Sequence, residues 1–347
     1  GPHPASIRRL ARGPAVVIAP FNFPLHLGNG AIVAHLLAGN PVIFKPSPFA
    51  AVVAAQYAQI IAAALPSGVF QLAQGGGGEG QALCLDSRVR AVCFTGSVPV
   101  GRSLAQSLAA DFAKELALEL GGRNAAIVCA DADLALAAEA VAEGACLTCG
   151  QRCNATSRVF VDRRVAPEFE ELLIAAVGKF QPGDPLLPET NLGPLISAAA
   201  VARYEQLAAA RADWLILGSA PKEAGGKRGH YVCPALRRGL TAHDAECFVP
   251  IVEIESFANL DESLIRHNAS PFGLTASIFT RSAETFQRLV DELPVGNVYA
   301  NIATTFSPST LPFGGLGLSG NGRPGGRDFI RFTTVEQALQ IRRDSLT

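Results

Sequence analysis

The chain has 347 residues, 49% of them hydrophobic and 17% charged, which is the balance of a globular α/β protein of about two domains. A net charge of −1 provides no electrostatic attraction to nucleic acid or to an anionic membrane, so neither partner is expected. Most of the eight cysteines have apolar neighbours in the sequence, where Cys behaves as a small hydrophobic residue, so no metal site is expected. The length of the chain argues against a disulfide framework and favours reduced thiols in a cytoplasmic protein.

Short apolar runs alternate with helical segments over the first 120 residues. The segment 49–65 carries no charge, but Gln56, Gln59 and many alanines favour a helix packed on a sheet over a membrane span. The alternation predicts right-handed crossovers and a doubly wound parallel sheet. The predicted strands are 15–20, 41–44, 68–72, 91–94 and 115–120, and the predicted helices are 29–37, 49–65, 79–84 and one opening at Ser97.

The pattern restarts after Gly122 and predicts a second α/β domain. Its strands are expected at 125–128, 158–161, 250–257, 277–280 and 296–300, and its helices at 134–151, 167–180 and 198–212. Asp133 is a plausible N-cap for the first of these helices. The alternating segment 333–343 predicts a terminal strand with no partner in its own neighbourhood, which we expect to pair with another subunit.

Two residues suggest nucleophilic chemistry on a carbonyl. Cys153 follows Gly150, Gln151 and Arg152, and a thiol is intrinsically nucleophilic once its proton is removed. Glu119 ends a predicted strand ahead of two glycines, which allow close backbone approach, and a carboxylate at this edge of a sheet lies where ligands bind. Taken singly, a buried thiol and a salt-bridged carboxylate are the commoner interpretations, and Cys149 competes with Cys153 as the nucleophile.

Three further features accompany this pair. Asn22 lies between two aromatic residues and two prolines, where its amide could donate to a developing oxyanion or simply form a turn. Thr95, Gly96 and Ser97, with Gly101 one turn later, join a strand to a helix and offer free N–H groups to phosphate. Lys45 ends a strand and could hold ribose or phosphate, although it could equally be a surface lysine.

The ordered combination of motifs resembles the aldehyde dehydrogenase superfamily over nearly the whole chain. The motifs are Pro20–Pro24, Phe44–Ser47, Phe94–Ser97, Glu119–Gly122, Gly150–Cys153, Glu246–Pro250 and Pro312–Gly315. Within the superfamily, residues 22–27 and 309–324 are most similar to the succinylglutamate semialdehyde dehydrogenases of arginine catabolism.

The resemblance implies a role for each matching residue. Cys153 would attack the aldehyde, with Asn22 holding the oxyanion, and Glu119 would activate the water that hydrolyses the thioester. The implied cofactor is NAD, with NADP possible, held by Lys45, Ser47, Thr95, Gly96, Ser97, Gly101, Glu246 and Phe248. Loop 306–311 and residues 25–30 would line the aldehyde tunnel, with Phe23, Arg152, Ser309 and Thr310 as candidate substrate residues. The implied domains are 1–121 for dinucleotide binding, 122–318 for catalysis and 319–347 for a return segment and oligomerisation strand, in a homodimer or homotetramer.

Three departures from the family pattern modify these expectations. Pro48 stands where the family often has a glutamate that favours NAD over NADP. Val249 replaces a glycine, so we expect the nicotinamide loop to be displaced. The family also has a longer N-terminal segment, of which only residues 6–11 would remain here, so we expect an uncovered face on the first sheet and a terminal strand short of a partner.

Two alternatives stay open. The chain could turn over the same thioester with CoA, although Glu119 favours hydrolysis. It could also be an inactive homologue that acts as a binding or assembly module.

Overall fold

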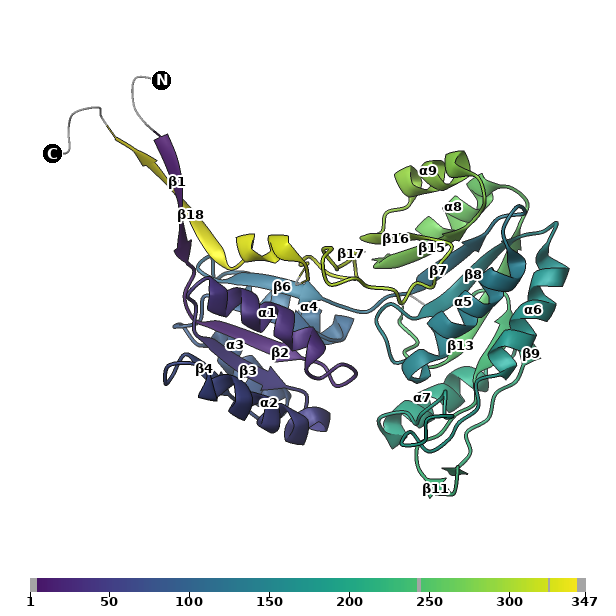
Figure 1. Ribbon diagram of the computed structural model, residues 1–347, viewed down its shortest axis with the longest axis horizontal. Coiled ribbons are helices and arrows are strands. Elements are labelled where there is room, and N and C mark those ends of the chain that lie inside the picture. The colour runs from purple at the N-terminus through teal and green to yellow at the C-terminus, as the bar shows by residue number, and fades with distance from the viewer. Residues whose placement is uncertain (1–4, 242–244, 324, 342–347) are drawn as a thin grey trace. The chain divides into compact units, whose positions relative to one another are not determined.

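The computed structural model describes residues 5–241, 245–323 and 325–341, and the chain divides into two compact units (Figure 1). The first unit is Gly1–Glu119 with Pro308–Phe313 and Asn321–Thr347. The second unit is Leu120–Ser307 with Gly314–Gly320. Each unit therefore includes segments that are distant in sequence.

The first unit is built on a five-stranded parallel sheet in the order β4-β3-β2-β5-β6. Its central strands are short runs of Ala, Val, Ile, Phe and Cys that are buried along most of their length, as expected for a parallel sheet covered on both faces. The strands are β2 (Ala15–Ala19), β3 (Val42–Pro46), β4 (Phe70–Leu72), β5 (Ala91–Thr95) and β6 (Glu115–Glu119).

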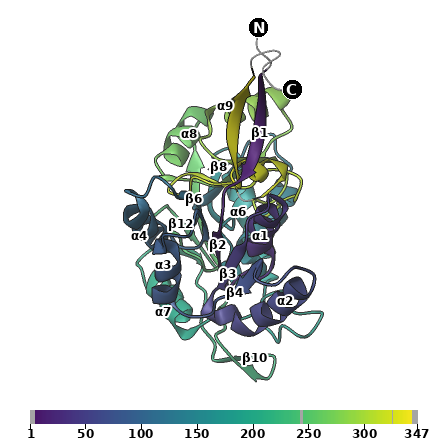
Figure 2. The same cartoon turned by 90° about the vertical axis from the view of Figure 1, so that its left-hand side faces the viewer.

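Helices cover both faces of this sheet (Figure 2). Small residues such as Ala54 and Ala58 let one helix lie close against Phe44 and Phe70 of the strands. The expected uncovered face is therefore wrong. The helices are α1 (His26–Leu37), η1 (Pro48–Ala50) and α2 (Ala51–Ala63) on one side, α3 (Gly77–Leu85) and α4 (Val98–Leu108) on the other, and η3 (Arg327–Arg331) against α1.

A separate two-stranded antiparallel ribbon belongs to the first unit. It joins β1 (Ala5–Ala11) to β18 (Thr334–Gln340), from Ala5 opposite Gln340 to Ala11 opposite Thr334. The expectation of an unpaired terminal strand is therefore wrong, because β1 supplies its partner within the chain; residues 342–343 of the predicted strand lie outside the described residues.

The second unit is built on a seven-stranded sheet in the order β16-β15-β7-β8-β13-β12-β9. All neighbours are parallel except β12 and β9, which pair antiparallel at one edge. The sequence analysis predicted neither β9 nor β12. The strands are β7 (Asn124–Val128), β8 (Thr156–Asp162), β9 (Asp213–Ile216), β12 (Ala235–Arg238), β13 (Ile251–Phe257), β15 (Thr275–Phe279) and β16 (Asn297–Ala300), with short pairs β10 (Glu223–Ala224) with β11 (Lys227–Arg228) and β14 (Phe272–Gly273) with β17 (Leu316–Gly317).

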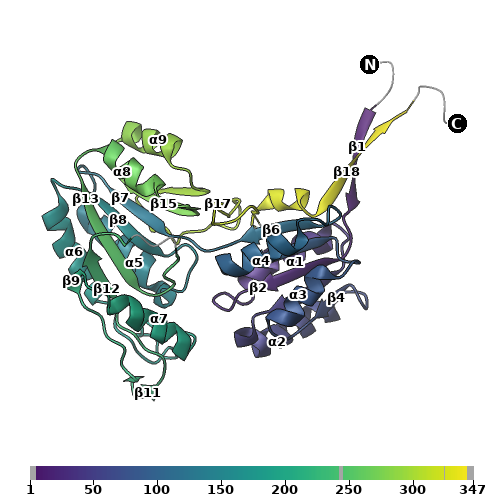
Figure 3. The ribbon, with the colours of Figure 1, turned by 180° about the vertical axis from the view of Figure 1, so that it is seen from behind.

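Alternate residues of the strands supply the two cores of this unit. Ala126 and Val128 of β7 face one core, whereas Ala125 and Ile127 face the other, as the period of two in a strand requires. Figure 3 shows the corresponding helices from behind. They are α5 (Leu134–Cys146), α6 (Ala166–Gly178) and α7 (Ala198–Ala208) at the first core, and α8 (Leu260–Asn268) and α9 (Ala283–Glu292), which the sequence analysis missed, at the second.

The helix predicted to reach Gln151 ends earlier. Asp133 caps its start as predicted, because its carboxylate accepts the Leu136 N–H at 3.1 Å. The helix stops at Cys146, and the 3₁₀ segment η2 (Leu147–Gly150) follows, with Thr148 and Cys149 at φ near +55°. No helix in the described part of the chain is long and apolar enough to cross a membrane.

Candidate active site

The carboxyl edge of the first sheet collects five of the residues singled out in the sequence. Ala19 lies opposite Pro46 and Thr95 lies opposite Glu119, so β2, β3, β5 and β6 end together. Asn22, Lys45, Thr95, Ser97 and Glu119 therefore lie at or just beyond one edge. The strand order also reverses direction between β2 and β5, and such switch points at carboxyl ends are where open α/β sheets bind ligands.

A pocket of 320 Å³ opens beside the end of β3. Lys45 comes directly before Pro46, the first residue of the pocket lining. Burial lowers the pKa of Lys45, and the nearby Glu79 counteracts that lowering. The Glu79 carboxylate accepts the Gly76 N–H at 2.8 Å at the start of α3. The pocket is lined by Pro46, Ser47, Pro48, Ala51, Gln74, Gly75 and Gly76, so its walls offer glycine backbone and a hydroxyl but no acidic side chain.

The start of α4 resembles a phosphate site. Ser97 is the N-cap residue, yet its side chain makes no capping hydrogen bond, so it does not occupy the first N–H groups of the helix. A helix N-terminus with available N–H groups attracts anions. Gly96 is required as glycine, because an added Cβ would lie 2.5 Å from the Phe94 ring. A dinucleotide cofactor therefore fits this unit, with the pocket beside β3 and the α4 terminus as its polar contacts.

Glu119 is 2% exposed, and its backbone carbonyl accepts the Gly96 N–H at 3.0 Å. This bond ties the end of β6 to the turn that leads into α4. Asn22 lies in the loop between β2 and α1, where the Phe21 ring packs edge-on against Phe49 with ring centroids 5.9 Å apart. Both residues are thus held on short connections of the first sheet.

The loop that carries Cys153 is anchored in the second unit by a residue the sequence analysis missed. The Asn124 amide donates to the carbonyls of Cys153 and Ala155, each at 2.8 Å, and its oxygen accepts the Thr275 N–H at 3.1 Å. Gln151 is held in turn, because its side-chain oxygen accepts the Ile196 N–H at 2.9 Å. Asn124 opens the buried strand β7, and nothing in its local sequence indicates these contacts.

The two competing thiols differ in environment. Cys149 is 1% exposed and packs in the apolar core with Cys146, and burial raises its pKa to about 12. Cys153 is only partly buried. Burial, and secondarily the nearby Cys153, raises the pKa of the Tyr299 phenol to about 12. Because the thiolate is the reacting form, the environment of Cys149 disfavours it as a nucleophile.

Other parts of the chain approach Gly121 and Gly122 closely, as the sequence analysis predicted. A Cβ on Gly122 would lie 2.6 Å from the Cys153 carbonyl oxygen, and one on Gly121 would lie 2.4 Å from the Glu246 carboxylate. That carboxylate accepts the Gly122 N–H at 3.2 Å, and Arg203 donates to the Glu246 carbonyl. Burial raises the pKa of Glu246 to about 8. Two glycines therefore let the Cys153 loop and the Glu246 loop approach the same turn.

Val249 does not need the backbone of a glycine. The left-handed conformation falls on Phe248, with φ 57°, and not on Val249, which is 5% exposed and packs in the main core. The expected displacement for lack of a glycine at 249 therefore loses its basis. The glycine that this region requires is Gly150, which has φ 67° and where an added Cβ would lie 2.5 Å from the Val249 carbonyl carbon.

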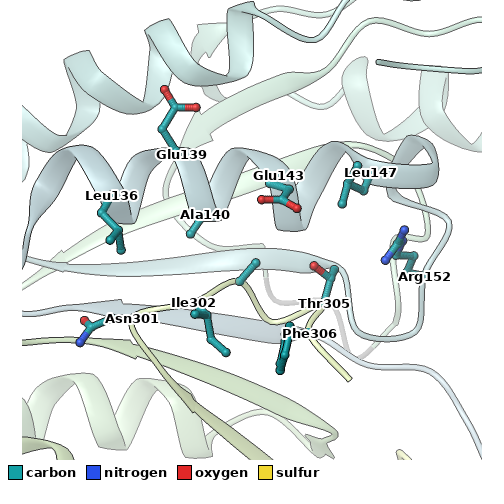
Figure 4. A pocket seen from close by; sticks show the side chains of 11 residues that line it. Leu136, Glu139, Ala140, Glu143, Leu147, Arg152, Asn301, Ile302, Thr305 and Phe306 are labelled. Atoms are coloured by element: carbon teal, nitrogen blue, oxygen red, sulfur yellow. The ribbon is translucent and has the colours of Figure 1, made fainter. Parts of the chain in front are cut away.

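A second pocket, of 440 Å³, lies between α5 and the segment after β16 (Figure 4). Arg152 faces it, and the Arg152 Nε donates to the Thr148 hydroxyl at 2.9 Å. The opposite wall is fixed at two points: Asn301 donates to the Thr280 carbonyl at 3.0 Å, and Thr304 contacts Thr156 at 2.8 Å. The lining residues are Leu136, Glu139, Ala140, Glu143, Leu147, Arg152, Asn301, Ile302, Ala303, Thr305 and Phe306.

The predicted substrate residues are distributed between the units. Arg152 lies in the second unit, whereas Phe23, Ser309 and Thr310 belong to the first. Of the predicted loop 306–311, Phe306 lines the second unit's pocket. The sequence analysis missed Glu143, because a charged residue on an amphipathic helix is ordinarily a solvated one. Among the described residues, no group of three or more His, Cys, Asp or Glu side chains could hold a metal ion.

Comparison with known proteins places this arrangement in a class of enzymes that oxidise aldehydes. The model of the aldehyde dehydrogenase family matches residues 2–339, and the chain belongs to that family. It is 36% identical over 336 residues to 4-trimethylaminobutyraldehyde dehydrogenase of Mus musculus, covering 94% of this chain and 68% of the relative.

Solved structures agree with this assignment. An NAD-dependent aldehyde dehydrogenase from Sinorhizobium meliloti superposes with a TM-score of 0.93 at 30% identity, covering 99% of this chain and 70% of that one. An indole-3-acetaldehyde dehydrogenase in complex with NAD+ superposes with a TM-score of 0.91 at 31% identity, covering 97% and 70%. The predicted α/β fold with parallel sheets is therefore confirmed.

Proposed function

We propose that this protein oxidises an aldehyde to a carboxylic acid, with NAD as the hydride acceptor and Cys153 as the nucleophile. The observation that carries the proposal is the contrast between the two thiols, since Cys153 is partly exposed on an anchored loop while Cys149 is buried. Relatives described as NAD-dependent or solved with NAD+ support the choice of cofactor.

The first unit would hold the cofactor. Lys45 and Ser47 would contact the adenosine ribose beside the 320 Å³ pocket, and the free N–H groups at Ser97 would bind the pyrophosphate, with Thr95, Gly96 and Gly101 shaping that turn. Bound NAD would accept a hydride from the substrate carbon. Pro48 leaves the pocket wall without a carboxylate, so the 2′-phosphate of NADP would meet no repulsion from that position.

The chain's own residues would then carry the acyl steps. The Cys153 sulfur would attack the aldehyde carbon, and the Asn22 amide with the Cys153 N–H would hold the resulting oxyanion. Loss of hydride converts this thiohemiacetal to a thioester. Glu119 would take a proton from the attacking water, so that hydrolysis releases the acid and restores the thiol. In the second unit, Glu246 and Phe248 would contact the nicotinamide side of the cofactor.

The finer substrate proposal is a semialdehyde such as succinylglutamate semialdehyde. Arg152 supports it, because its guanidinium faces the 440 Å³ pocket and would pair with a substrate carboxylate. Phe23, Ser309 and Thr310 are kept as candidate contacts from the first unit. The same proposal includes a place in arginine catabolism and a cytoplasmic location. It also includes a homodimer or homotetramer and the three-part domain division.

The test is NADH absorbance on addition of aldehydes to the wild-type protein and to Cys153→Ala, with Cys149→Ala as the matched control. We expect Cys153→Ala to lose turnover by at least about 10³-fold, as loss of a covalent nucleophile does, while Cys149→Ala retains it. NAD binding by calorimetry should be retained in both variants. Full activity of Cys153→Ala would overturn the mechanism, and NADH formation only in the presence of CoA, with an acyl-CoA as the product, would overturn hydrolysis.

A further inference from the structure

The 440 Å³ pocket carries charges of both signs. Two carboxylates one helical turn apart on α5, Glu139 and Glu143, line it together with the Arg152 guanidinium. Its remaining walls are largely apolar, with Leu136, Ile302 and Phe306 among them. Carboxylates in the lining would repel an anionic ligand group, so binding of an anion alone does not explain them.

The two carboxylates are not equivalent. Glu139 forms an ion pair with Lys179 of the segment that follows α6, and Figure 4 shows its side chain directed away from the 301–306 segment. Glu143 lies on the side of α5 that is turned toward that segment (Figure 4). Within the part of the chain that the structure describes, Glu143 makes no ion pair and no side-chain hydrogen bond.

Glu143 and Arg152 are close enough to interact through space without closing into an ion pair. Burial lowers the pKa of Arg152, and its electrostatic interactions with Cys153 and Glu143 counteract that lowering. The Arg152 Nε is instead engaged by the Thr148 hydroxyl. The Glu143 carboxylate therefore remains available to a ligand group in the same pocket.

We infer that Glu143 binds a cationic group of the aldehyde, so that the pocket takes an ammonium-bearing aldehyde. The inference rests on the proposed function, and it adds a cation to the carboxylate assigned to Arg152. An aldehyde of amino-acid type, with both charges at its far end, would satisfy both side chains.

The physical chemistry favours an organic ammonium ion over a hard metal ion. A single exposed carboxylate is too few ligands for a divalent cation, which takes several oxygens. An alkylammonium group needs one counter-charge and apolar contacts for its carbons, and the face of the Phe306 ring attracts a cation further. Glu143 supplies the counter-charge, and Leu136 and Ile302 supply the apolar contacts.

The experiment compares two aldehydes of the same shape, 4-trimethylammoniobutyraldehyde and its uncharged counterpart 5,5-dimethylhexanal, by NADH formation. In the wild-type protein we expect kcat/KM to favour the cation by about three- to tenfold, the scale of an exposed charge pair. Glu143→Gln should abolish that preference through KM, leaving turnover of the neutral aldehyde unchanged. Glu139→Gln, whose carboxylate is already paired, is the matched control and should keep the preference.

Salt provides a second readout, because screening should reduce the wild-type preference and leave Glu143→Gln unaffected. A preference that survives in Glu143→Gln, or that is equally lost in Glu139→Gln, overturns the inference. Turnover of both aldehydes at equal rates by the wild-type protein also overturns it while leaving the proposed function intact. Failure of every aldehyde to react overturns the proposed function and the inference together.

Discussion

Replacing Gly122 by alanine should disturb the backbone of the proposed nucleophile. The new methyl group would lie 2.6 Å from the Cys153 carbonyl oxygen and 2.6 Å from the Asn124 amide oxygen, whereas ordinary contacts begin at 3.4 Å. The neighbours must therefore give way by about 0.8 Å. Neither can do so easily, since the Asn124 amide is itself bonded to the Cys153 and Ala155 carbonyls and to the Thr275 N–H.

The displacement has two expected costs. Overpacking of this kind destabilises a folded protein by about 1–3 kcal/mol. A shift of roughly 1 Å at a reacting group can lower the rate about 10²-fold, so we expect kcat for aldehyde oxidation to fall by about ten- to a hundredfold. NAD binding, which we assign to the first unit, should change little.

The assay is steady-state NADH formation by Gly122→Ala, with urea unfolding of the same sample. Gly178→Ala, at the end of α6, is the control, because an added Cβ there meets nothing within 4 Å. It should be as stable and as active as the wild-type protein. Wild-type kcat in Gly122→Ala would refute the reasoning that this close approach positions Cys153.

Two further predictions concern buried charges. Burial raises the pKa of Glu246 to about 8 from an ordinary 4.5, so the contribution of Glu246 to stability is fully present below pH 4.5 and is lost as the pH rises through 8. The urea midpoint of Glu246→Gln should vary less across that window, and a pH profile identical to that of the wild-type protein would contradict the assignment. Arg237 and Glu253, each 1% exposed and joined at 2.5 Å, form a buried ion pair, and the other oxygen of the Glu253 carboxylate pairs with the buried Arg123. Glu253→Gln, which removes the carboxylate that Arg237 and Arg123 share, should cost about 3–5 kcal/mol of unfolding free energy, and Arg237→Met, which leaves Glu253 paired with Arg123, should cost less. The exposed Asp261→Asn, which loses the pair with Arg288, should cost under about 1 kcal/mol.

The sequence predicted the parallel-sheet fold well because its central strands are buried on both faces and therefore read as continuous apolar runs. It predicted α5 but not its end, since nothing in the local pattern indicates that Gly150 must approach the backbone of Val249. The strands β9 and β12 were missed for a related reason. β12 contains Arg237, whose burial depends on Glu253 of a neighbouring strand and on the Trp214 ring 5.1 Å away, and that partnership is invisible in either segment alone.

The candidate site was predictable to the extent that its residues lie in local motifs. Cys153, Glu119 and Asn22 each follow a recognisable run, and their chemistry can be named from residue type. Asn124 and Glu143 escape such reasoning because their importance lies in what they contact. An asparagine that opens a strand carries no sign that it will bond two carbonyls of a loop 29 and 31 positions away.

The discontinuity of the first unit constrains the order in which the chain can fold during synthesis. The Leu118 N–H donates to the Asn321 side-chain oxygen at 2.7 Å, and the Asn321 N–H donates to the Leu118 carbonyl at 3.1 Å. Arg8 donates to the side chain of Gln337, 329 positions later. The residue that binds the edge of β6 and the strand that pairs with β1 are therefore absent until all of the second unit has been translated. Contacts of such large sequence separation form slowly, so the first unit should reach its protease-resistant state only after the second has emerged.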